Sequence, residues 1–210
     1  METVTPTLIE WGVAARAHPG QRESGDQYWV HVRSKVARVA VVDGLGHGEE
    51  AAAAARTTVA TLQNYAGESP LASVQRCHEE LRSTRGVVMS LASFDANNKT
   101  MTWLGVGNVE GFLFHRDPRV VPGQEALLLR AGVIGDNLPR LVASVVEVDP
   151  GDLLIFATDG IRAEFADHVN LQESPQQNAD RILAQHGRET DDALVLVARY
   201  LYGQGATTRR

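Results

Sequence analysis

The sequence predicts an α+β domain in which long, mainly antiparallel strands are covered by helices. Two observations predict this class: two helical segments follow the first apolar runs, and a block of strand-like segments then precedes more helix and a last apolar run. Helices and strands segregated in this way are typical of α+β folds rather than of alternating βαβ units. In addition, 210 residues without a repeat, a linker or a change of composition predict a single domain, residues 1–210.

The amino-terminal segments have strand character. Leu8 to Arg16 and Tyr28 to Arg33 alternate apolar and polar residues with a period of two, which is typical of half-buried strands. Val36 to Val42 is a denser β-branched run, which indicates a strand buried on both faces. It ends at a glycine-rich loop, Asp43-Gly44-Leu45-Gly46-His47-Gly48.

Two helices are predicted after this loop. Glu49 to Tyr65 contains five consecutive alanines and two acidic residues in its first turn, where the helix dipole favours them. Pro70 to Ser83 is the second helix, because proline is well placed near a helix start and Gly86 follows its end.

The second half of the chain is predicted to be mostly strand. Val87 to Asp95 and Thr100 to Val106 flank a polar turn that suits a hairpin. Residues 161–186 have helical character with a break near Pro175. The remaining predicted strands are Val109–His115, Ala126–Arg130, Val142–Val148, Leu153–Thr158 and Ala193–Tyr200.

Composition excludes several classes of function. The chain has 26 acidic and 20 basic residues, a net charge of -6, which argues against a nucleic-acid or anionic-membrane surface. The single cysteine, Cys77, excludes an internal disulfide and a cysteine-rich zinc site. Without a signal peptide or a membrane-spanning apolar stretch, the chain is expected to be cytoplasmic.

Acidic residues lie at the ends of predicted strands, beside small residues. If those strands are neighbours, the carboxylates converge, and their repulsion and desolvation then require a cation. Oxygen ligands without sulfur suit Mg²⁺ or Mn²⁺, and two such ions can polarise a phosphoryl group and activate a bridging water. The alternative is that each Asp-Gly is an ordinary turn. The candidate ligands are Asp26, Asp43, Asp159, Asp191 and Asp192.

The ordered set of short motifs resembles the metal-dependent protein phosphatase (PPM) family, and within it the bacterial RsbU- and RsbX-like branch, whose stand-alone stressosome phosphatases are the most similar. The resemblance extends from about Leu8 to Tyr200. The motifs that carry it are Ser24-Gly25-Asp26, the glycine-rich loop at residues 43–48, Gly105-Val106-Gly107-Asn108-Val109, Thr158-Asp159-Gly160 and Asp191-Asp192.

This resemblance implies a four-layer α-β-β-α sandwich of two mainly antiparallel sheets flanked by helices, with two Mn²⁺ or Mg²⁺ ions at one end. By motif, Asp43 would bridge both ions and the Gly44 carbonyl would bind one of them. Asp159 and Asp191 would hold the other ion. Asp191 is favoured over Asp192, the fallback, because the family motif puts its ligand first.

Other positions follow the family less closely. Asp26 would bind a metal directly or through water. Many relatives have a candidate general acid where this chain has Leu45, so His47 is the candidate for that role; the alternative is a solvated histidine at a helix start. Asn108 replaces an acid that supports a third metal in some relatives. Arg22 lies one residue out of register with a phosphate-binding arginine of larger relatives.

The resemblance implies hydrolysis of phosphoserine or phosphothreonine in proteins by a metal-activated water, without a phosphoenzyme. It also implies phosphorylated STAS-domain proteins of the stressosome as substrates, selected by loops such as Gly132 to Arg140. Two alternatives stay open. A catalytically weak phosphoprotein-binding module is suggested by Leu45, and a small-molecule phosphohydrolase would use the same metals.

Overall fold

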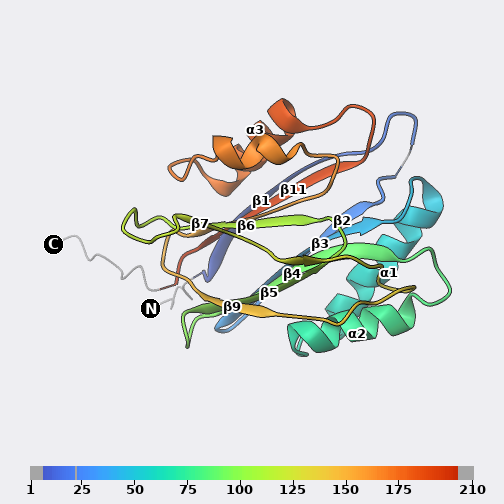
Figure 1. Ribbon diagram of the computed structural model, residues 1–210, viewed down its shortest axis with the longest axis horizontal. Helices are drawn as coiled ribbons and strands as arrows, with labels where there is room; N and C mark the ends of the chain where they lie inside the picture. Colours follow the sequence, from blue (N-terminus) through green and yellow to red (C-terminus); the bar gives the residue numbers. More distant parts are fainter. Residues whose placement is uncertain (1–6, 22, 203–210) are drawn as a thin grey trace, which may run out of the picture.

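The computed structural model describes residues 7–21 and 23–202, which form two packed β-sheets with helices on both outer faces (Figure 1). The first sheet has the order β1-β11-β10-β6-β7, and the second has the order β2-β3-β4-β5-β8, with β9 beside β5. Neighbouring strands are antiparallel except for β5 and β8. The strands of the first sheet are β1 (Ile9–Arg16), β6 (Glu110–Phe114), β7 (Gln124–Ala126), β10 (Leu153–Ala157) and β11 (Ala193–Tyr200). Those of the second are β2 (Asp26–Arg33), β3 (Val36–Gly44), β4 (Val87–Asp95), β5 (Thr100–Val106), β8 (Leu129–Arg130) and β9 (Ser144–Glu147).

The helices complete a four-layer α-β-β-α sandwich. Helices α1 (Glu49–Asn64) and α2 (Pro70–Glu80) cover the second sheet, and α3 (Pro175–His186) covers the first, beside a 3-10 helix η1 (Ala163–His168). The predicted α+β class and its layers are therefore confirmed. Within the described ranges, no helix is long and apolar enough to cross a membrane.

The core has three layers, one between each pair of neighbouring structural layers. Phe94 and Phe156 belong to the cluster between the two sheets. Leu62 of α1 and Cys77 of α2 pack against the second sheet, and Ile182 of α3 packs against the first. Central strands are covered on both sides, which explains why β10 is buried at every position and why its sequence is uniformly apolar.

The local signals placed most elements correctly, with one clear error. The strand predicted at Ala126–Arg130 is two short strands, β7 and β8, which belong to different sheets. The chain crosses between the sheets here, so Leu127 is 8% exposed in the central core while Leu128 is 58% exposed. The break expected near Pro175 is confirmed, because Ser174 caps α3 and Pro175 occupies its first turn.

Candidate functional site

Four strand ends bring the predicted acidic residues to one end of the sandwich. Asp26 starts β2 and is the register partner of Asp43, near the end of β3. Asp159 follows β10, and Asp191 with Asp192 precedes β11, the antiparallel neighbour of β10. In an antiparallel pair, the end of one strand lies beside the start of the next. Each sheet therefore contributes carboxylates at the same end.

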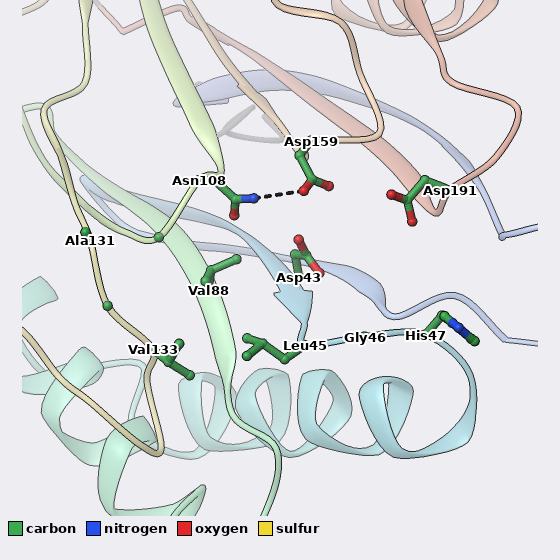
Figure 2. Close-up of a pocket in the computed structure, with 12 residues that line it drawn as sticks. Asp43, Leu45, Gly46, His47, Val88, Asn108, Ala131, Val133, Asp159 and Asp191 are labelled. Carbon is green, nitrogen blue, oxygen red and sulfur yellow. Dashed lines mark hydrogen bonds between the residues drawn. The ribbon is translucent and has the colours of Figure 1, made fainter.

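A cavity of about 620 Å³ opens between these strand ends (Figure 2). Asp43, Asp159 and Asp191 all line it, and Figure 2 shows their carboxylates grouped together. Asn108 lies beside them, and its Nδ2 donates a 2.8 Å hydrogen bond to Asp159 Oδ2. Asn108 therefore orients one oxygen of Asp159.

Asp26 is the most buried of the sequence-predicted acids, with 4% of its surface exposed. Thr158 Oγ1 donates to Asp26 Oδ2 at 2.7 Å and accepts a hydrogen bond from the Leu194 backbone N–H at 2.9 Å. The hydroxyl thus connects the start of β2 to β10 and β11 in the other sheet. Sequence analysis assigned Thr158 no role, although its place directly before Asp159 was a signal.

The adjacent residues Asp191 and Asp192 face different surroundings. Asp192 is 5% exposed, and its two oxygens accept hydrogen bonds from the backbone N–H groups of His18 (2.7 Å) and Gly25 (3.0 Å). Asp191 instead lines the cavity, where its Oδ1 accepts the Asp192 N–H at 2.9 Å. Asp192 therefore holds the loop before β2 in place, and Asp191 presents the more available carboxylate.

The carboxylates are difficult to ionise together. Burial, followed by the charges of Asp159, Asp191 and Asp192, raises the pKa of Asp43 to about 7. Burial and the charge of Asp43 raise the pKa of Asp26 to about 8, although the Thr158 hydrogen bond opposes the shift. A bound cation would reverse both effects, because it favours the charged form of each carboxylate.

The pKa of Asp159 is also raised, first by burial and then by the charge of Asp191. The hydrogen bond from Asn108 and the charge of Arg188 act in the opposite direction. No lysine or arginine is among the described residues that line the cavity, and Arg188 acts on Asp159 from outside that lining. Arg22 lies outside the described residues.

The donor atoms fit a hard divalent cation. Carboxylate and carbonyl oxygens are the ligands that Mg²⁺ and Mn²⁺ prefer, and Mg²⁺ commonly keeps several waters and binds through one or two carboxylates. Within residues 7–21 and 23–202, no three acidic, histidine or cysteine side chains are already arranged to close around one ion. The cluster therefore offers a few oxygen ligands on an open cavity rather than a closed cage.

Gly44 is fixed by close packing between β3 and α1. A Cβ atom at this position would lie 2.2 Å from the Ala51 carbonyl oxygen, so no larger residue fits. The Gly44 N–H donates to the Gly25 carbonyl at 3.0 Å, which ties the glycine-rich loop to the start of β2. Gly44 is buried and does not line the cavity, and its role as a metal ligand stays a prediction.

His47 and Leu45 both line the cavity but differ in their surroundings. The His47 ring is exposed and stacks on His18, with 5.2 Å between ring centroids. Its Nδ1 is 3.4 Å from Gln21 Nε2, and in Figure 2 the ring points away from Asp43. Leu45 is half-buried and packs against the central core. His47 therefore lies at the rim of the site.

Two sheets that share a carboxylate cluster at one end, with helices on both outer faces, define the PPM class of phosphatases. The chain belongs to the stage II sporulation protein E (SpoIIE) family, which its sequence matches over residues 33–201. It is a PPM-type phosphatase, and the resemblance noted from its motifs is confirmed.

Individual relatives agree with this assignment. Phosphoserine phosphatase RsbX of Bacillus subtilis (strain 168) is 23% identical over 188 residues, which cover 88% of this chain and 89% of RsbX. The crystal structure of RsbX with magnesium superposes with a TM-score of 0.81 at 21% identity, covering 91% of this chain and 95% of that chain. A chain from a study of the bacterial stressosome, a modular system adapted to control secondary-messenger signalling, has a TM-score of 0.83 at 31% identity, covering 91% and 99%.

Proposed function

We propose that this chain removes phosphate from phosphoserine or phosphothreonine in proteins, with two Mn²⁺ or Mg²⁺ ions held at the carboxylate cluster. One observation carries the proposal: Asp43, Asp159 and Asp191 line a single cavity, and no lysine or arginine is among its described lining residues. Carboxylates that converge on one cavity repel one another and need a counter-charge to be ionised together. Oxygen donors make a hard divalent cation the appropriate one.

Each acid has a proposed part in holding the ions. Asp43 would bridge both ions, and the carbonyl of Gly44 would bind one of them. Asp159 and Asp191 would hold the other. Asp191 is the better ligand of its pair because both oxygens of Asp192 already accept backbone N–H groups.

Asp26 would bind directly or through water. When bound, the ions would neutralise the cluster, polarise the phosphoryl group and lower the pKa of a water molecule. The chain's own contribution is orientation. Thr158 holds Asp26 by one hydrogen bond, and Asn108 holds one oxygen of Asp159. Removing a group that orients a metal ligand typically lowers metal affinity or activity about 10- to 100-fold.

His47 is the proposed donor of a proton to the leaving serine or threonine oxygen. It lines the cavity, and its ring stacks on that of His18. A second candidate function, a phosphoprotein-binding module with little turnover, is favoured by Leu45, which lines the cavity where many relatives have the candidate acid.

The proposed substrates are phosphorylated proteins of a bacterial stress-response pathway, in particular STAS-domain proteins of the stressosome. This part of the proposal is supported by the similarity to RsbX and to the stressosome-related chain. We place the reaction in the cytoplasm, where a free buried thiol such as Cys77 stays reduced.

The test is phosphate release from a phosphoserine protein with Mn²⁺ and then with EDTA. Wild type should release phosphate only with metal. Asp43→Asn should lower that rate at least about 100-fold, because removing a metal ligand has a larger effect than removing a group that only orients a ligand. Asp167→Asn is the matched control, since Asp167 is exposed and lies in η1. Release that survives EDTA would overturn the metal assignment. Metal binding without release would favour the binding module.

A further inference from the structure

The cavity has two unlike walls. One side carries the carboxylates of Asp43, Asp159 and Asp191, and the other is formed by aliphatic side chains (Figure 2). The apolar wall consists of Leu45, Val88 and Val133, with Ala131 beside them. A phosphate group and its cations need only the acidic side. The aliphatic side is therefore available to another part of the substrate.

The packing of the fold places Val88 at this wall. Gly107 adopts a φ of 95°, and a Cβ atom there would lie 2.1 Å from Val88 Cγ1. Only glycine leaves room for the Val88 side chain at this point. Leu45 is half-buried and packs on the same central core as Val88. These two side chains are parts of the rigid sandwich.

Val133 belongs to the segment 131–143, which connects β8 to β9 and is anchored beside the cavity. Its neighbour Ile134 is fully buried and exchanges two 2.9 Å backbone hydrogen bonds with Val87 of β4. On the other side, the Gly135 N–H donates to Nδ1 of the buried His78 in α2 at 2.9 Å. The aliphatic wall is thus held in place before any substrate arrives.

Gly86, which has no side chain, allows the segment 131–143 to pack closely against the chain just before β4. It has a φ of 80°, and a Cβ atom there would lie 2.6 Å from Val133 Cγ1 and 2.6 Å from the Ile134 carbonyl oxygen. A wall built with this degree of close packing loses little conformational entropy when an apolar group binds to it.

We propose that the wall of Leu45, Val88 and Val133 receives an aliphatic side chain that lies within two residues of the phosphorylated serine or threonine. The inference rests on the proposed function and names the class of sequence that this site accepts. Consecutive Cα atoms are about 3.8 Å apart, so a side chain this close in sequence can reach the opposite wall of one cavity. An acidic side chain would gain nothing from this wall, because burying a charge against aliphatic groups costs free energy.

The experiment compares phosphoserine peptides of one length. The parent peptide has glycine at the two positions on each side of phosphoserine, and leucine or aspartate replaces one glycine at a time. With Mn²⁺, kcat/KM of wild type should rise about tenfold for leucine in at least one position, which is the scale of one aliphatic contact in an apolar pocket. Aspartate at that position should give no such rise, because a charged side chain is not stabilised by an aliphatic wall.

Two variants locate the preference. Val133→Thr keeps the shape of the side chain but adds a hydroxyl, so the leucine-to-glycine ratio of kcat/KM should fall several-fold. Val145→Thr is the matched control, because Val145 is 64% exposed on β9, and does not line the cavity; the ratio should stay at the wild-type value.

The outcomes separate this inference from the proposed function. Equal kcat/KM for leucine, glycine and aspartate peptides in the wild type would overturn the inference and leave the phosphatase assignment intact. A leucine preference that Val133→Thr does not reduce would also overturn it. Failure of wild type to cleave any phosphoserine peptide or phosphoprotein with Mn²⁺ bound would overturn the proposed function itself.

Discussion

Asp26 and Asp43 are directly opposed residues on the neighbouring antiparallel strands β2 and β3. Like charges in opposed positions destabilise a pair of strands. Burial is the largest of the causes that raise the pKa of Asp26 to about 8 and the pKa of Asp43 to about 7. For Asp26, the charge of Asp43 is the second cause. The metal-free fold therefore favours their protonated forms.

The metal-free protein should lose stability as the pH rises from about 4 to about 8. Between the ordinary pKa and the raised values, the folded state binds more protons than the unfolded state, so the free energy of unfolding decreases with pH. Below about pH 4, both carboxyls are protonated in the folded and in the unfolded state, so they cause no loss of stability there. Thermal unfolding in EDTA at pH 5, 6.5 and 8 measures the effect.

Two controls belong to this measurement. Asp26→Asn should flatten the pH dependence because it removes one member of the pair. Saturating Mg²⁺ should raise the melting temperature most at pH 8, where binding releases the fewest protons. A melting temperature in EDTA that rises steadily between pH 5 and pH 8 would contradict the assignment.

The pair Asp191 and Asp192 should separate metal binding from stability. Asp191→Asn should weaken Mn²⁺ binding at least about tenfold, as loss of a carboxylate near a metal does, with little change in the free energy of unfolding. Asp192→Ala should cost about 1–3 kcal/mol of stability, because it leaves the buried Gly25 N–H and the half-buried His18 N–H without their acceptors. Metal titration and urea denaturation of both variants provide the comparison. If the two effects were exchanged, Asp192 would be the ligand.

Thr158 should matter for both the fold and the site. Thr158→Val keeps the shape but removes the hydroxyl that donates to Asp26 and accepts from the Leu194 N–H, which should cost about 1–3 kcal/mol. It should also raise the pKa of Asp26 further, since that hydrogen bond opposes the shift. Thr57→Val is the control, because the Thr57 hydroxyl donates an exposed hydrogen bond to the Ala53 carbonyl of its own helix, α1. Equal stability of the two variants would show that the link between the sheets is unimportant.

The role of His47 can be tested through the leaving group. A proton donor matters most for a poor leaving group, so His47→Gln should lower kcat for a phosphoserine peptide by about 100-fold. For p-nitrophenyl phosphate, whose leaving group needs little protonation, the loss should be much smaller. His31→Gln controls for the loss of a histidine, since His31 lies in β2 away from the cavity. Equal and small losses on both substrates would leave His47 as a solvated residue at the rim.

Local patterns in the sequence were sufficient for most of the elements. The uninterrupted apolar run of residues 153–157 indicated a buried strand, and β10 is buried at every position. Pro70 indicated a helix start and Pro175 indicated a break, and both lie in the first turn of a helix. Such signals succeed because side-chain periodicity and capping depend on residues only a few positions apart. The acidic motifs could be found in the sequence for the same reason, because each consists of adjacent residues.

Long-range packing decided the rest. Asp26 and Thr158 are 132 positions apart in sequence, and only the packing of one sheet on the other makes them hydrogen-bond partners. Likewise, only the loop before β2 determines that Asp192 is held by backbone N–H groups while Asp191 faces the cavity. The sequence by itself determined the elements and the acidic residues at their ends. The tertiary structure decided which of those residues meet, because strand pairing and sheet packing join segments that no local pattern connects.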